Sequence, residues 1–433
     1  MPHPKIIFNK KHMKTTTLLF VLLASAVFVF AQKSTQSYDV LIRKADSLYR
    51  SADYKHSAFA FSDAFHATDS NISMNHRYNA ACSYALAGNP DSAFLNLNYI
   101  ATFMNYSRYT HIKSDPDLKP LYTDSRWEPL VELVKANKDN AYAKLDFITL
   151  NGHKIEVHTA GMNNNQPNKP VIVFENGMAD TYERWNFIID EVSKTNAVFA
   201  YNRPRLGESE DDSLPPTTQH IVSNLRKMLS ERGLKPPYLL VSHSFGGAYI
   251  RSFASYYPNE IAGLVFVDPI DFTKKKGMGE LPYLEMGLTM HQIDSAFGEP
   301  NKDFLEKLYT EMPRYYVEEV KISVQLTQTE FNECDQNPLP DVPVHFIMAG
   351  GYSESVGDKS PLVCDWEKLF RVSENLKMKR YLQLLYPLTY GKLFYCSSSS
   401  HFVQTDEPDL LLSSIKLALI DFEKIQKGNK TSR

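Results

Sequence analysis

The chain has 433 residues, of which 43% are hydrophobic and 12% aromatic, and its formal net charge is −3. This length exceeds one ordinary domain, and the composition excludes a disordered chain. Because the net charge is close to zero, it gives no reason to expect a nucleic acid or an anionic membrane surface as partner, and we expect a small-molecule partner.

The first segment is typical of an export signal. Lys10, Lys11 and Lys14 precede an unbroken apolar run from Leu18 to Phe30, and a polar stretch follows Ala31. About 13 apolar residues are fewer than the roughly 20 that a membrane-spanning helix needs, although a membrane anchor is the alternative. We therefore expect residues 1–31 to be a signal peptide and the mature protein to be periplasmic or secreted, with no stable membrane span.

Helical periodicity extends over residues 37–140. A series of small and large residues between Ala45 and Ala64 recurs about 36 residues later, between Ala81 and Ile100. This spacing resembles the tetratricopeptide repeat, a helical hairpin that stacks on its neighbours. The resemblance implies a surface for a protein or peptide partner, and the alternative is a module used only for packing or spacing.

From residue 145 the pattern changes to strands that alternate with helices, which predicts a mostly parallel sheet covered on both faces. Residues 145–161 are a predicted hairpin, whose Asn151–Gly152 pair fits a type I′ turn. About 70 residues separate the predicted strands 263–269 and 342–351, so we expect residues 271–340 to be a helical cap inserted over the sheet. The other predicted strands are 171–177, 197–203, 238–244 and 391–400.

Ser244 lies where the predicted strand 238–244 runs directly into a helix. A serine hydroxyl is a weak nucleophile, and an enzyme that uses it must hold it exposed, near a base and near donors for the oxyanion. A sharp strand-to-helix turn does this, and it requires small residues two positions away on either side. Ser242 and Gly246 occupy these positions, so the pattern is S-x-S-x-G in place of G-x-S-x-G. We predict that Ser244 is a nucleophile, and the alternative is a turn that serves tight packing alone.

Residues 145–425 resemble the α/β-hydrolase family in four features that occur in the family's order. The stretch VIVFENGM ends where the family places its oxyanion loop, with Asn176 in place of the usual histidine. The stretch YNRPRLGESE resembles the family's D-x-x-G-x-G-x-S turn, with Asn202 in place of the aspartate and Gly207 retained. The third feature is the turn at Ser244. The fourth is SSSSHFVQTDEPDLLL, which resembles the loop that carries the family's catalytic histidine.

The resemblance implies roles for several residues. His401 is the matching base, and the backbone N–H groups of Met178 and Phe245 are the matching oxyanion donors. The acid stays open between two positions: Asp268 ends a buried strand, and Glu354 follows the next strand at the family's usual spacing. Asp358 is a third candidate acid, and Asp268 is favoured because it stands on rigid backbone.

The predicted reaction is acyl transfer from a small-molecule ester, thioester or amide to water, without a metal or organic cofactor. One alternative is an aminopeptidase, which needs a cap carboxylate for the substrate ammonium. Another is a non-catalytic binding protein in which the helical repeats are the working part. Candidates for the ammonium-binding carboxylate are Glu285, Glu299, Glu318 and Glu319. Candidates for lining an acyl pocket are Phe245, Trp185, Tyr283, Leu284 and Met290, and the alternative for each of them is an ordinary core residue.

The four cysteines are too few and too scattered for a disulfide scaffold, and their spacing does not match a zinc site. An oxidising compartment would allow a disulfide between Cys334 and Cys364 in an exported chain, and unpaired buried thiols are the alternative.

Overall fold

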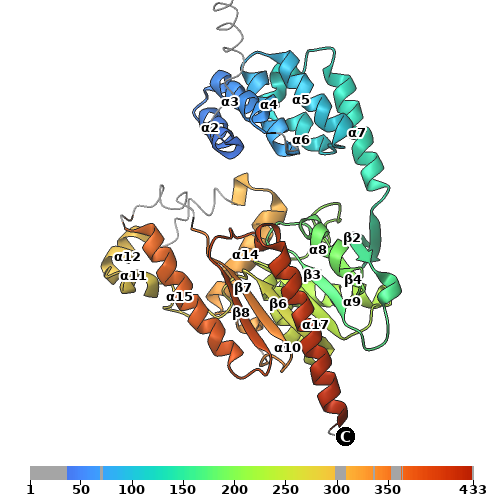
Figure 1. Cartoon of the computed structure of the whole chain (residues 1–433), viewed down its shortest axis with the longest axis vertical. Helices are drawn as coiled ribbons and strands as arrows, with labels where there is room; N and C mark the ends of the chain where they lie inside the picture. Colours follow the sequence, from blue (N-terminus) through green and yellow to red (C-terminus); the bar gives the residue numbers. More distant parts are fainter. Residues whose placement is uncertain are drawn as a thin grey trace, which may run out of the picture. The chain divides into compact units, whose positions relative to one another are not determined.

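The computed structural model describes residues 37–68, 72–297, 309–334, 337–352, 362 and 364–431 (Figure 1). The chain divides into two compact units, Met1–Lys144 and Leu145–Arg433. The expected signal peptide lies outside the described residues. Among the helices of the described ranges, none has the length and apolar character needed to cross a membrane.

The first unit is helical. Its helices pack in chain order, α2 on α3, α3 on α4 and α4 on α5, and buried alanines allow the close contacts, with Phe61, Phe94 and Leu97 between them. The helical region expected before the sheet is therefore confirmed, whereas its resemblance to the tetratricopeptide repeat stays a prediction. Its elements are α2 (Tyr38–Arg50), α3 (Tyr54–His66), α4 (Met74–Leu86), α5 (Pro90–Phe103), α6 (Tyr109–Ser114), η1 (Pro116–Leu121) and α7 (Trp127–Tyr142).

The second unit is built on an eight-stranded sheet with the order β1-β2-β4-β3-β5-β6-β7-β8. The hairpin strands β1 and β2 are antiparallel, β2 is antiparallel to β4, and the remaining neighbours are parallel. The mostly parallel sheet is thus confirmed. Its strands are β1 (Asp146–Leu150), β2 (His153–Ala160), β3 (Val171–Glu175), β4 (Val198–Tyr201), β5 (Tyr238–His243), β6 (Ile261–Val267), β7 (Val344–Ala349) and β8 (Gly391–Cys396).

Alternate residues of each strand point to opposite faces of the sheet, so both faces carry apolar side chains. Helices cover both faces and bury these side chains. On β3, Val171 and Val173 belong to one core cluster and Ile172 and Phe174 to the other. The first cluster includes residues of α9 (Thr218–Glu231), α10 (Gly246–Tyr256) and α15 (Trp366–Leu385). The second includes residues of α8 (Asn186–Val192) and α17 (Pro408–Thr431), and α17 runs past the predicted end of the domain at residue 425 (Figure 1).

The segment between β6 and β7 contains the expected helical insertion. Within the described residues it holds α11 (Leu281–Glu285), α12 (Met290–Phe297), α14 (Arg314–Gln328) and η5 (Asn332–Cys334). Helix α14 buries Ile322 and Leu326 in the first core cluster. Cys364 is a free thiol, so the bridge to Cys334 that the sequence left open is not formed.

Helix α17 offers a matched test of the second core cluster. Ile415 is 1% exposed, whereas Ile420 on the same helix is 45% exposed. We predict that Ile415→Ala lowers the free energy of unfolding by about 2–5 kcal/mol, because it leaves a cavity beneath the sheet. Ile420→Ala is expected to change it by less than about 0.5 kcal/mol. Urea titration of both variants measures this, and equal losses would contradict the assignment of the core face.

Candidate active site

Ser244 occupies the turn between β5 and α10 and has a positive φ of 51°. A non-glycine residue in this conformation is strained and needs support from its surroundings. Its N–H donates to the carbonyl of Val267 at 3.0 Å, and its own carbonyl accepts from Ile270 at 2.9 Å and from Gly247 at 3.0 Å. The backbone of Ser244 is thereby tied to the end of the adjacent strand β6.

The two small residues that flank this turn are not equivalent. A Cβ atom at Gly246 would lie 2.6 Å from the carbonyl oxygen of Asn176 and 2.8 Å from that of Glu175, so glycine is required there. Ser242 instead lies within β5 and is fully buried, and its hydroxyl has no hydrogen-bond partner in the described part of the chain. The strand therefore accommodates the serine, although its hydroxyl contributes no hydrogen bond.

The structure brings together Ser244, His401 and Asp268. His401 Nε2 lies 2.9 Å from Ser244 Oγ, and His401 Nδ1 lies 2.6 Å from Asp268 Oδ2. Because an ionised carboxylate only accepts, we assign the Nδ1 hydrogen to the bond with Asp268, which leaves Nε2 free to accept from the serine. The alternative acids Glu354 and Asp358 lie outside the described residues.

Asp268 is positioned directly after β6 with a φ of 37°, and its side chain is 12% exposed. Burial alone would raise its pKa, but the hydrogen bond from His401 and the charge of Lys377 outweigh burial and hold the pKa below its usual value. Lys377 Nζ lies 3.6 Å from Asp268 Oδ1 and 2.8 Å from Glu374 Oε1. Sequence reasoning missed Lys377, because a lysine on a helix resembles any surface residue.

His243 lies next to the candidate nucleophile but is 2% exposed. Its Nε2 lies 2.9 Å from the carbonyl oxygen of His401, and its ring packs against Trp185 and Phe402. Burial, with a further contribution from His401, lowers the pKa of His243 to about 4, so this imidazole is neutral at pH 7. A neutral His243 adds no charge beside His401.

The expected oxyanion donors, the N–H groups of Met178 and Phe245, have no protein acceptor among the described residues. Phe245 is the residue before α10, where helix N–H groups favour negative charge. The side chains of Phe245 and Trp185 are each 1% exposed and belong to the two core clusters. Both residues are therefore core residues, which was the alternative to a role in lining an acyl pocket.

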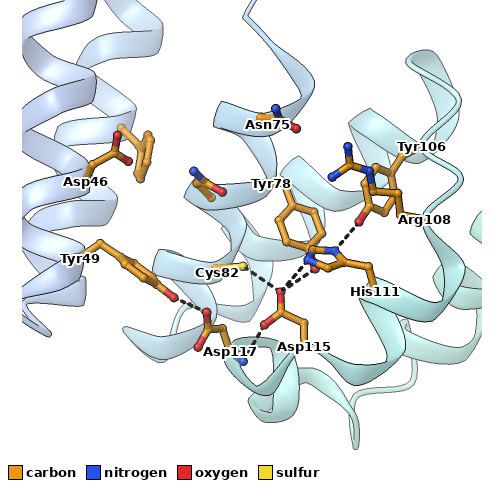
Figure 2. Close-up of a pocket in the computed structure, with 12 residues that line it drawn as sticks. Asp46, Tyr49, Asn75, Tyr78, Cys82, Tyr106, Arg108, His111, Asp115 and Asp117 are labelled. Carbon is orange, nitrogen blue, oxygen red and sulfur yellow. Dashed lines mark hydrogen bonds and ion pairs between the residues drawn. The ribbon is translucent and has the colours of Figure 1, made fainter. Parts of the chain in front are cut away.

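A separate pocket of about 380 Å³ lies within the helical first unit (Figure 2). Tyr78 donates to Asp115 at 2.8 Å, Tyr49 donates to Asp117, and the thiol of Cys82 points toward Asp115. Burial raises the pKa of this thiol. The lining of this pocket is polar and aromatic. The expected peptide or protein partner of the helical unit stays a prediction.

A family model described as the alpha/beta hydrolase family matches residues 172–413, which is more than half of the chain. The protein belongs to the alpha/beta hydrolase family. The match includes Ser244, Asp268 and His401, together with the loop that contains Met178.

Among curated proteins, this α/β hydrolase is 33% identical over 98 residues to the uncharacterised protein YqjL of Bacillus subtilis (strain 168), which covers 23% of this chain and 39% of the relative. It is 29% identical over 319 residues to the probable transporter efuK of Hormonema carpetanum, and this match covers 66% of this chain and 44% of that relative. The chain spans less than half the length of these relatives.

Among solved structures, a probable hydrolytic enzyme from Pseudomonas aeruginosa PAO1 has 14% identity and a TM-score of 0.41, covering 64% of this chain and 93% of that one. An alpha/beta hydrolase fold protein from Burkholderia ambifaria has 14% identity and a TM-score of 0.39, and the match covers 62% of this chain and 96% of that one.

The turn at Ser244 gives a matched pair of variants. We predict that Gly246→Ala lowers the free energy of unfolding by about 3 kcal/mol, because the new methyl group meets backbone atoms that cannot rotate away. Ser242→Ala is expected to lie within about 1 kcal/mol of the wild type, because it removes a buried hydroxyl without a partner. Thermal and urea unfolding of both variants test this, and a Gly246→Ala protein as stable as Ser242→Ala would contradict it.

The depressed pKa of His243 predicts a loss of stability in acid. Since its folded-state pKa of about 4 lies below the ordinary value of about 6.5, the native state binds fewer protons than the unfolded state between these pH values. The contribution of His243 to the free energy of unfolding is therefore fully present above pH 6.5. It falls by on the order of 3 kcal/mol as the pH decreases to 4. His243→Gln, which keeps a donor for the His401 carbonyl, is expected to lose less stability over this range. Parallel losses in urea titrations would show that His243 is not the cause.

Proposed function

We propose that the protein is an exported serine hydrolase that cleaves an ester, thioester or amide of a small molecule through an acyl-enzyme intermediate. The observation that carries this proposal is the continuous contact from Ser244 Oγ through the His401 imidazole to Asp268, at 2.9 and 2.6 Å. The proposal of export rests on the sequence of residues 1–31 alone.

In the proposed reaction, Ser244 Oγ attacks the substrate carbonyl carbon while its proton passes to His401 Nε2. The N–H groups of Met178 and Phe245 stabilise the negative charge on the carbonyl oxygen. When the bond to the leaving group breaks, His401 transfers the proton to that group. Water then attacks the acyl-enzyme, with His401 first accepting its proton and then returning it to Ser244. Asp268 stays ionised and stabilises the imidazolium in both halves, in line with its lowered pKa.

Two observations disfavour the aminopeptidase alternative. Glu319 is buried and already bound to Arg203 and to the N–H of Ala179, so it cannot bind a substrate ammonium. Glu318 pairs with Lys321 at 3.0 Å. Glu285 is exposed on α11, and Glu299 lies outside the described residues. A non-catalytic binding role is disfavoured because a scaffold does not need a serine, histidine and aspartate in hydrogen-bonding sequence.

The proposal predicts that Ser244→Ala abolishes turnover and that Asp268→Asn lowers kcat by about 10⁴-fold, because the amide no longer favours the correct imidazole tautomer. Turnover is measured with p-nitrophenyl esters of increasing chain length beside amino-acid anilides. Ester turnover without anilide turnover is expected, because Glu319 is already bound to Arg203 and Ala179 and Glu318 is paired with Lys321.

Ser242→Ala is the control for this test, because it removes a buried hydroxyl two residues from Ser244 and should leave kcat within about twofold of the wild type. Turnover in Ser244→Ala equal to that of this control would remove Ser244 as the nucleophile. Full activity in Asp268→Asn would instead assign the acid to another residue.

A further inference from the structure

Arg203 is a buried cation that the proposed mechanism does not use. It follows β4, and its side chain is 1% exposed. Its guanidinium has four short contacts, each with a different group, so its donors are largely satisfied. These are Glu175 Oε1 at 2.7 Å, Glu319 Oε1 at 2.7 Å, the carbonyl oxygen of Asn176 at 2.8 Å and the carbonyl oxygen of Gly177 at 2.6 Å.

The bond to the Gly177 carbonyl bears directly on the oxyanion loop, residues 176–179. The carbonyl of Gly177 and the N–H of Met178 belong to the same peptide group, which is planar, so fixing the oxygen also fixes the direction of the N–H. A cationic donor on the carbonyl also polarises the group and strengthens the N–H as a donor. Arg203 is thus placed to orient and strengthen the proposed oxyanion donor without contacting the substrate.

Glu319 holds the other side of the same loop from the helical insertion. Its side chain, on α14, is 3% exposed. Oε2 accepts from the N–H of Ala179 at 2.6 Å, while Oε1 accepts from Arg203 Nε at 2.7 Å. Ala179 has a positive φ of 53°, a conformation that needs such support. The peptide groups on either side of Met178 are therefore both bound to one Arg203–Glu319 pair.

The charges of this group are arranged around one cation. Glu175 is fully buried, and its second oxygen accepts from Tyr201 at 2.6 Å. Burial raises the pKa of Glu175, and the charge of Arg203 opposes this rise. A buried ion pair often adds little net stability compared with apolar packing. A stabilising effect therefore does not by itself explain why Arg203, Glu175 and Glu319 are buried here.

We propose that Arg203 and Glu319 are positioning residues for the oxyanion donor Met178, and that the insertion thereby takes part in catalysis through α14. This inference rests on the proposed serine hydrolase function, because Met178 needs a fixed direction only if it stabilises an oxyanion.

The test is Glu319→Gln in the full chain, with Glu318→Gln on the same helix as the matched control. Ala179 and Arg203 donate to different oxygens of Glu319. The amide replaces one of these oxygens with an NH₂ group, which then faces a donor instead of accepting from it, while Arg203 remains paired with Glu175. We expect kcat per active site to fall about 10–100-fold with little change in KM, because the loss arises in the transition state. The affinity for a trifluoromethyl ketone, which forms a tetrahedral oxyanion adduct, should fall by a similar factor. Glu318→Gln should keep wild-type values.

Active sites are counted by fluorophosphonate titration, so that a fall in the folded fraction is not mistaken for a fall in kcat. Glu319→Asp is the second variant, because it keeps the buried charge but is one methylene too short to reach both partners. It should show a smaller loss of the same kind. Wild-type kcat and ketone affinity per active site in either folded Glu319 variant would overturn the inference.

The two proposals fail in different ways. Ser244-dependent turnover that is unchanged by Glu319→Gln overturns the positioning role alone. If the unmutated protein shows no Ser244-dependent turnover on esters or anilides, the proposed function fails and this inference fails with it.

Discussion

The structure of the site depends on the close approach of two backbone segments, the turn at Ser244 and the loop after β3. This approach is so close that a methyl group at Gly246 would lie 2.6 Å from the carbonyl of Asn176. It is possible because β3 and β5 are parallel neighbours whose carboxyl ends meet at one edge of the sheet. The next strand in that order, β6, places Asp268 beside them, and the loop after β8 brings in His401. The geometry of the candidate site is thus a consequence of strand order.

Electrostatics then differentiates residues that look alike in the sequence. His243 and His401 have ring centroids 4.5 Å apart, but His401 Nε2 lies against Ser244 Oγ, whereas His243 Nε2 is bound to the His401 carbonyl. Burial also lowers the pKa of His243, which makes it a weaker base. Asp268 stays ionised because His401 and Lys377 oppose the effect of burial. In the loop after β3, Arg203 donates hydrogen bonds to the carbonyl oxygens of Asn176 and Gly177. The buried charges Asp268, Arg203 and Glu319 each have a charged partner, as the cost of desolvation requires.

Much of this arrangement could be predicted from local patterns. Alternating strands and helices indicate the sheet. The small residues around Ser244 and the loop around His401 are local signals that can be recognised even though Ser242 and Asn176 depart from the family pattern. The sequence does not decide the acid, because the choice between Asp268 and Glu354 depends on which strand end approaches His401 in three dimensions. Arg203 and Glu319 are separated by 116 residues and look like ordinary surface charges in the sequence. Phe245 and Trp185 are near the site along the chain, but their side chains pack in the two core clusters, and sequence proximity does not determine this direction.

Covalent labelling tests whether Ser244 is the activated nucleophile that we propose. The folded protein is treated with a fluorophosphonate, and the adduct is located by intact mass and peptide mapping. We predict one adduct per chain, on Ser244, and none when the protein is first unfolded in urea, since activation requires His401 at 2.9 Å. An unlabelled folded protein, or an adduct on a different residue, would contradict it.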